Sequence, residues 1–332
     1  KLDHSTFLGL TNVPAVELAR KLVDVAPSNL TRVFYSDNGS TAVEIALKMS
    51  FQFWRQKGKE FAHKQKFISF SNAYHGDTIG SVSLGGVELF HRIFKPLLFK
   101  SYKVFYPDCY RCPFGKQPDS CEVYCLNDFK VSLNKHYQSV CAVVVDPTVQ
   151  GAAGMLTAPR GFLKRIETLC REHNVHLILD EVATAFGRTG TMFACEHEQV
   201  APDFLALAKG LTGGTLPLAA TLTTSEVFEA FLGEYTDFKS FFHGHTYTGN
   251  PLACAAAAAN LDLFKSEKTL QKLKPKMGYL KRALADFWQL GHVGDIRQVG
   301  FMVGIELVKD RDERSEADVE SRVQTKQQRH DQ

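Results

Sequence analysis

The residue best suited to covalent chemistry is a lysine that ends an apolar run. In "DFLALAKGLTGG" (203–214), Lys209 follows Phe204, Leu205 and Leu207 and precedes glycines. One interpretation is a surface lysine at a strand end, because lysine is seldom buried without a partner. The other is an amine in a dry pocket, where desolvation lowers the pKa of a lysine and makes it a nucleophile that can form a Schiff base.

A carboxylate ends a second apolar run. Asp180 closes "VHLILD" (175–180), and a carboxylate at the end of a buried strand requires a cationic or hydrogen-bonding partner. Glu181 points to the opposite side of the strand, which argues against a paired-carboxylate site. A metal would need more ligands nearby, so no metal is expected here and a protonated heterocyclic nitrogen suits Asp180 better. A helix cap or a loop carboxylate is the alternative.

A third polar feature joins a short strand to a helix. The stretch "SDNGS" (36–40) places Gly39 and Ser40 at the expected helix start. Free N–H groups and the positive end of the helix dipole favour an anion there, phosphate above all. The stretch is neither a Walker loop nor a dinucleotide fingerprint, and an ordinary turn is the alternative.

Together, the three features match the three binding groups of pyridoxal 5′-phosphate (PLP). Ligands of open parallel sheets bind outside the C-terminal ends of the strands, where all three features are expected. The phosphate would meet the helix start, the ring nitrogen would meet Asp180, and the aldehyde would meet Lys209.

The predicted elements favour an α/β fold with a mostly parallel, doubly wound sheet. The runs at 140–147 and 175–181 are apolar without alternation, as in strands buried on both faces. A helix at 160–174 separates them, which gives the strand–helix–strand order of such sheets. Further predictions are helices at 15–26 and 41–58, the latter with a capping box of Thr41 and Glu44 and with Gly58 at its end, and strands at 33–35 and 66–70.

A change of pattern near Leu270 predicts a second domain. A helical stretch is followed by the alternating "IRQVGFMVGIELV" (296–308). We therefore expect a PLP-binding large domain at 1–268 and a partial α+β small domain at 269–332 that ends in a polar tail. Both ends of the sequence are abrupt, which predicts a fragment with a truncated start.

Four stretches resemble the class III aminotransferases of fold type I, and among them the 8-amino-7-oxononanoate aminotransferases of biotin synthesis. They span roughly residues 30–260 and read "SDNGSTAVEIALKMSFQFW", "AYHGDTIGSVSLGG", "ILDEVATAFGRTGTMFACEHEQVAPDFLALAKGLTGGTLPLAATLTT" and "HGHTYTGNPLACAAA".

The resemblance implies PLP as the cofactor and a role for each of seven residues. Lys209 would form the Schiff base and carry the proton as general acid–base, with Asp180 and Tyr74 as the other catalytic residues. The implied cofactor contacts are Asp180 with the pyridinium nitrogen, Gly39 and Ser40 with the phosphate, Tyr74 and Val182 on the two faces of the ring, and Thr246 with the phosphate of the neighbouring subunit's cofactor. Tyr74 as a core aromatic is the alternative, and His75 could pack at the site or orient another residue.

The resemblance also implies the reaction and the assembly. A homodimer would convert 8-amino-7-oxononanoate to 7,8-diaminopelargonate in ping-pong order through pyridoxamine phosphate, with S-adenosylmethionine or lysine as the amino donor. Alternatives are another class III activity on ω-amino acids or ornithine, and a catalytically silent scaffold. Asp146 stands where the family usually has glutamate, and its role stays open.

Four clustered cysteines are a separate feature. Cys109, Cys112, Cys121 and Cys125 have the spacing C-x2-C-x8-C-x3-C, and four thiolates so spaced can hold zinc tetrahedrally. A surface insertion with reduced thiols is the alternative, and a zinc-binding interaction module is a further interpretation of the whole chain.

Composition narrows the class of protein. A net charge of +3 over 332 residues, without a basic stripe, gives no indication of nucleic-acid binding. No apolar run reaches the roughly 18 residues of a membrane helix, and the opening residues show no signal-peptide pattern. We expect a cytoplasmic enzyme that acts on small molecules and binds neither nucleic acid nor membrane.

Overall fold

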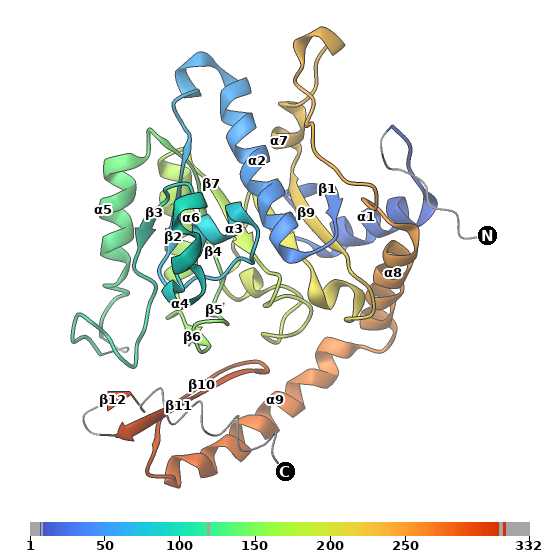
Figure 1. The fold of residues 1–332 in the computed structure, drawn as a ribbon. Coiled ribbons are helices and arrows are strands. Elements are labelled where there is room, and N and C mark those ends of the chain that lie inside the picture. The colour runs from blue at the N-terminus through green and yellow to red at the C-terminus, as the bar shows by residue number, and fades with distance from the viewer. Residues whose placement is uncertain (1–6, 8, 118–119, 312–314, 317–332) are drawn as a thin grey trace.

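A seven-stranded sheet forms the centre of the molecule (Figure 1). The computed structural model describes residues 7, 9–117, 120–311 and 315–316. The strands of this sheet are β1 (Leu30–Ser36), β2 (Lys66–Phe70), β3 (Tyr102–Val104), β4 (Val140–Val145), β7 (His176–Asp180), β8 (Phe204–Leu207) and β9 (Ala219–Thr224).

The sheet is mostly parallel, as the apolar runs predicted. The strand order is β1-β9-β8-β7-β4-β2-β3, and the pairs from β8 to β3 are all parallel. Strand β9 pairs antiparallel with both β8 and β1 and was not predicted. The parallel pairing of β7 with β8 places the ends of these two strands side by side, since Asp180 pairs with Ala206.

Helices cover both faces of the sheet, so the fold has three layers. Alternate residues of β4 face different cores, with Val143 in one and Val144 in the other. The major helices are α1 (Val13–Val25), α2 (Gly39–Lys57), α3 (Ile79–Leu84), α4 (Glu88–His91), α5 (Leu126–His136), α6 (Phe162–Glu172), α7 (Ser225–Glu229), α8 (Pro251–Ser266) and α9 (Thr269–Ala285). Residues of α1, α5, α6 and α8 line the first core, and α2 supplies most of the helical residues of the second.

The start of α2 differs from the prediction. Its N-cap is Asn38, whose side chain accepts a hydrogen bond from the backbone N–H of Thr41, and the Thr41 hydroxyl oxygen accepts one from the backbone N–H of Asn38. The predicted capping box of Thr41 and Glu44 is therefore wrong by one turn. The Glu44 carboxylate instead accepts from the backbone N–H of Gly80 at 2.7 Å, which ties α3 to α2. Gly58 ends the helix as predicted.

The C-terminal part forms a separate small sheet beside α9, below the main body in Figure 1. The sheet consists of β10 (Val293–Val299), β11 (Met302–Asp310) and β12 (Ser315–Glu316), and a two-stranded pair, β5 (Val149–Gln150) and β6 (Leu156–Thr157), flanks Gly154. Arg297 connects this small sheet to the turn between β5 and β6, because its guanidinium donates to the carbonyl of Gly154 at 2.8 Å; it also pairs with Glu306 of its own sheet at 2.7 Å. The domain boundary at 268/269 stays a prediction, and most of the expected polar tail lies outside the described residues.

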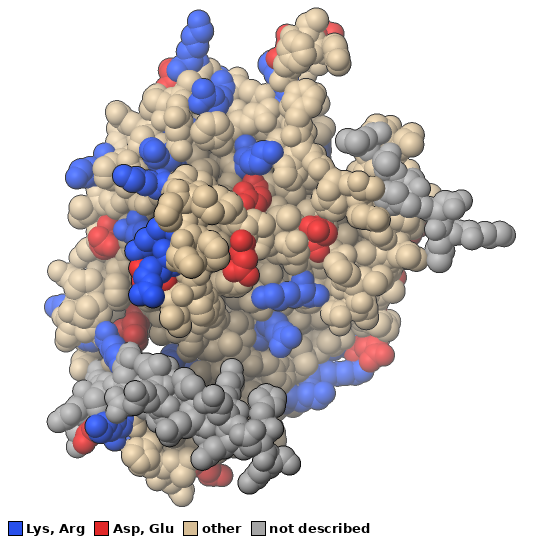
Figure 2. Space-filling view, viewed as in Figure 1, with Lys and Arg blue, Asp and Glu red and all other residues tan. Residues whose placement is uncertain are grey.

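Helix length and surface charge can be followed on the described residues. Among the described residues, no helix is long and apolar enough to cross a bilayer. On the face drawn in Figure 2, cationic and anionic side chains are interspersed.

The packed core predicts a large cost for truncating a central aromatic. Phe70 is fully buried at the end of β2 and meets Phe129 and Phe162 in ring contacts. Phe70→Ala should lower the free energy of unfolding by about 3–5 kcal/mol, because it leaves a cavity. Urea unfolding followed by fluorescence measures this, with the exposed Leu89→Ala as the control that should change stability little. Equal losses in both variants would contradict the packing described.

Candidate functional site

A cleft of about 900 Å³ opens at the C-terminal ends of β4, β7 and β8. Six of the seven residues to which the sequence assigned a cofactor role line it: Gly39, Ser40, Tyr74, Asp180, Val182 and Lys209. The other lining residues used below are His75, Gly76, Asp77, Asp146, Met155, Arg188 and Met302. The structure thus brings together six assigned residues of which the first and last, Gly39 and Lys209, are 170 positions apart in the chain.

Asp180 is held at the floor of the cleft by two hydrogen bonds. Its Oδ2 lies 2.7 Å from Nδ1 of His75, and its Oδ1 accepts from the backbone N–H of Val182 at 3.0 Å. Asp180 and His75 are both buried. One ligand atom each of His75, Asp146 and Asp180 lie within 4.8 Å of one another. Glu181 points to the other side of the strand, as predicted, and accepts from the backbone N–H groups of Ala194 and Cys195.

The charges of this cluster shift one another. Burial raises the pKa of Asp146 to about 7, the charge of Asp180 acts in the same direction, and His75 and Lys209 act against it. For His75, burial lowers the pKa, but Asp146 and the hydrogen bond to Asp180 outweigh burial and raise it. The site therefore favours a positive charge between two carboxylates.

The start of α2 forms the opposite end of the cleft. A Cβ atom on Gly39 would lie 2.6 Å from Cγ1 of Val182, and one on Gly76 would lie 1.7 Å from Oγ of Ser40. Gly76 also has a φ of +110°, which favours glycine. The Val182 side chain and the backbone at Gly76 therefore approach the helix start closely, and the Ser40 hydroxyl accepts from the N–H of Asp77 at 3.1 Å.

Lys209 follows β8 and reaches the cleft from an unusual backbone conformation. Its φ is +46°, in the left-handed region that non-glycine residues seldom adopt, and it begins a short 3-10 turn. Such conformations cluster at functional sites because the surrounding fold must hold them. The side chain is exposed to the cleft in the single chain. The predicted dry pocket around this amine is therefore absent in the chain taken alone.

Tyr74 and Val182 lie on the walls of the cleft. The Tyr74 hydroxyl donates to Asp77 at 2.8 Å, and its ring lies parallel to that of His91 with the centroids 6.4 Å apart. Burial, with the hydrogen bond to Asp77, raises the pKa of Tyr74. Tyr74 is not a core aromatic, because it faces the cleft.

Thr246 is not among the residues that line the cleft. It lies in a turn between α7 and α8, and its side chain is exposed. The neighbouring Thr248 is buried and accepts from the N–H of His245 at 3.1 Å. A role for Thr246 in its own subunit's cleft has no support in this geometry.

Three lining residues had no role assigned from the sequence. His75 was undecided, and the structure makes it the partner of Asp180. Asp146 was left without a role, although it directly follows β4 and so meets the same sheet edge as Asp180. Arg188 was missed. Its signal was the "GRTG" turn after β7, which places an exposed guanidinium on the cleft.

The residues present fit PLP at both ends of the cleft. Nε2 of His75 and Oδ2 of Asp146 are buried without a hydrogen-bond partner, in a cluster that favours an added positive charge. At the other end, the glycine-lined start of the 19-residue helix α2 suits a phosphate. The amine of Lys209 lines the same cleft.

Comparisons with known proteins agree with this geometry. The family described as Aminotransferase class-III matches residues 1–328. The chain is 56% identical over 323 residues to the adenosylmethionine-8-amino-7-oxononanoate aminotransferase of Nitratidesulfovibrio vulgaris. The aligned region covers 97% of this chain and 60% of that protein. The chain thus spans about three fifths of that relative's length.

Two solved structures share the fold. The adenosylmethionine-8-amino-7-oxononanoate aminotransferase of Methanocaldococcus jannaschii has a TM-score of 0.89 at 47% identity, over 96% of this chain and 70% of its own. An amine transaminase from an uncultivated Pseudomonas species, in its PLP-bound form, has a TM-score of 0.90 at 33% identity, over 97% and 73%. Both cover nearly all of this chain, so the fold type is established.

The raised pKa of Asp146 predicts a pH-dependent stability of the cofactor-free protein. A group whose pKa is raised on folding stabilises the fold below its unfolded-state pKa of about 4, and this contribution is lost as the pH rises through about 7. Asp146→Asn removes this contribution to the free energy of unfolding. The variant also lowers the raised pKa of His75, which makes stability decline with pH in the same way. Urea unfolding at a series of pH values between about 5 and about 8 should show a smaller decline for the variant. The exposed Asp286→Asn is the control, and parallel curves for Asp146→Asn and wild type would contradict the account.

Proposed function

Because the chain belongs to the class-III aminotransferases, a PLP-dependent family, we propose that it forms the cofactor-binding part of an enzyme of biotin synthesis. The proposed reaction transfers an amino group to 8-amino-7-oxononanoate and yields 7,8-diaminopelargonate. The observation that carries the proposal is the single cleft in which Lys209, Asp180 and the start of α2 meet. The 56% identity to a relative named for this activity supports the choice of substrate.

Each residue has a task that follows from its place. When bound, PLP supplies an aldehyde for amine exchange and a protonated ring that accepts electrons. Asp180 would keep the proton on the ring nitrogen, and His75 holds the carboxylate in place for this at 2.7 Å. Gly39 and Ser40 would bind the phosphate through the helix start. Tyr74 and Val182 would enclose the ring.

Lys209 would be both the attachment point and the proton carrier. Its amine is exposed to the cleft, so an incoming amine can displace it. Once free, the amine can take a proton from the donor carbon and return it on the other side of the transfer, as a general acid–base.

The substrates are carboxylate-bearing amines and ketones, and Arg188 is suited to bind a carboxylate. Arg188 is the only arginine among the described residues that line the cleft, and a guanidinium binds a carboxylate through two parallel hydrogen bonds. The donor is S-adenosylmethionine or lysine, of which the names of the relatives favour the first. The competing proposal is a different class III activity. The identity to the amine transaminase is 33%, lower than the 56% identity to the Nitratidesulfovibrio vulgaris relative, which favours the biotin-synthesis reaction.

We also propose that two copies of the chain build the active site. Thr246 is exposed and lies outside the cleft of its own chain, which leaves it free to reach the phosphate site of a second copy. Large apolar side chains near it are exposed as well, with 74% of Phe242 and 62% of Tyr247 accessible. Burial of these side chains against a partner would stabilise a homodimer.

Lys209→Ala tests the central assignment. The variant should bind PLP without the absorbance band of the lysine-linked cofactor and should lose turnover, because no amine remains to bond the aldehyde or carry the proton. Its urea unfolding should stay close to that of the wild type. A visible spectrum with added PLP, followed by an assay for 7,8-diaminopelargonate, measures both effects.

Lys274→Ala on the exposed side of α9 is the matched control and should keep band and turnover. Turnover retained in Lys209→Ala would overturn the assignment. A wild-type band that responds to ω-amino acids but to neither S-adenosylmethionine nor lysine would favour the competing class III activity.

A further inference from the structure

The clustered cysteines lie in the loop that joins β3 to α5, outside the cleft. This loop enters at Phe105 and ends at Cys125, the residue before α5. The other four cysteines of the chain are buried in the main body, whereas three of the clustered ones are half-buried: Cys109, Cys112 and Cys121. The cluster takes no part in the reaction proposed above.

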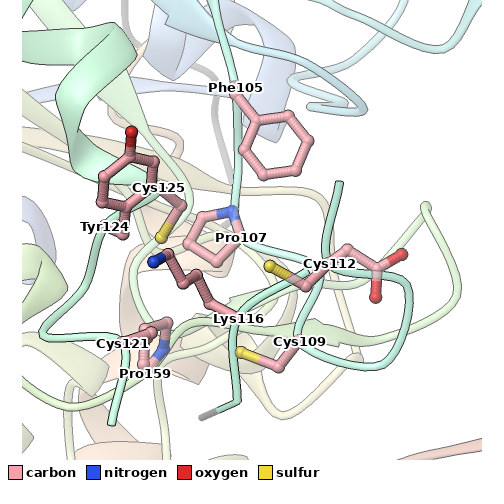
Figure 3. A pocket seen from close by; sticks show the side chains of 10 residues that line it. Phe105, Pro107, Cys109, Cys112, Lys116, Cys121, Tyr124, Cys125 and Pro159 are labelled. Atoms are coloured by element: carbon pink, nitrogen blue, oxygen red, sulfur yellow. The ribbon is translucent and has the colours of Figure 1, made fainter. Parts of the chain in front are cut away.

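All four cysteines of the loop face one small cavity. The cavity measures about 20 Å³, which is room for a single ion or water molecule. Figure 3 shows the sulfur atoms of Cys109, Cys112 and Cys125 turned toward the same space, with Lys116 beside them. Phe105, Pro107 and Tyr124 close the cavity from the apolar side.

The backbone of the second pair is held in an unusual conformation. Between Cys121 and Cys125, Glu122 has a φ of +48° and Val123 one of +60°. A β-branched residue in the left-handed region is a marked outlier, which persists only where the surroundings fix it. Arg165 contributes to this by donating to the carbonyl of Glu122 at 2.5 Å.

We propose that the four cysteines of this loop bind one structural zinc ion. Zinc prefers four thiolates in a tetrahedron with Zn–S bonds of about 2.3 Å, and the pairs C-x2-C and C-x3-C supply two from each arm of the loop. Among the described residues, a group of three possible metal ligands within 4.8 Å of one another occurs at His75, Asp146 and Asp180 and not among the loop cysteines. The cysteine sulfur atoms must therefore move closer together when the ion binds. The Lys116 ammonium lies where it offsets the excess negative charge of four thiolates.

The zinc would fix a contact between the cysteine loop and the small sheet. Arg111, between Cys109 and Cys112, pairs with Glu306 of β11 at 2.7 Å. Glu306 also pairs with Arg297, which donates to the carbonyl of Met155 at 3.2 Å. Met155 lines the cofactor cleft. The ion thus has a structural task, to hold the loop that braces one wall of the cleft.

Metal analysis of the purified chain tests the proposal. Protein produced with zinc in the medium and purified without chelator should carry one zinc per chain by plasma mass spectrometry. The double variant Cys109→Ser/Cys125→Ser should bind zinc at least about 100-fold more weakly, since a closed site loses two of four ligands. Cobalt added to the zinc-free wild type should give a thiolate-to-metal absorbance band that the double variant lacks.

Cys254→Ser, in α8, is the matched control and should keep the zinc. Should the double variant fail to fold, thiol labelling of the wild type decides. Alkylation followed by peptide mapping should modify the four loop cysteines only after zinc is removed. Zinc-free protein as purified, iron in its place, or disulfides between these cysteines would each overturn the proposal.

Discussion

The burial of one carboxylate at the end of β7 is the constraint on which the site depends. Asp180 has two hydrogen bonds, from His75 and from the backbone of Val182, and a second carboxyl, Asp146, shares its surroundings. Two carboxylates in a poorly solvated place repel each other, so a cation between them stabilises the arrangement. A protonated ring nitrogen is such a cation, and His75 serves in part when the ring is absent.

The sheet order turns this local constraint into a complete site. Parallel strands place Asp146 and Asp180 on the same edge, and the pairing of β7 with β8 brings Lys209 next to them. The helix start at Gly39 lies at the same edge. Gly39 has no side chain, so Val182, two residues beyond Asp180, can pack against its backbone. Under the proposed assignment, the ring nitrogen, the aldehyde and the phosphate would meet these three strand ends and one helix.

The sequence predicted the parts of the fold that have a local cause. The buried parallel strands followed from continuous apolar runs, and Lys209 and Asp180 followed from their positions at strand ends. Strand β9 could not be read from its pattern, because its pairing is set by neighbours far along the chain. The same holds for the contact of His75 with Asp180, which spans 105 positions. The apolar run left the exposure of Lys209 open, since a dry pocket requires parts beyond the run itself.

The most direct measurement of the central claim is chemical trapping of the bound cofactor. The chain is loaded with PLP, reduced with borohydride, digested and mapped by mass spectrometry. The account predicts one pyridoxyl group per chain, on the peptide that contains Lys209, and no such group in the Lys209→Ala variant. A label on another lysine, or none on the loaded wild type, would contradict the assignment of this cleft as the cofactor site.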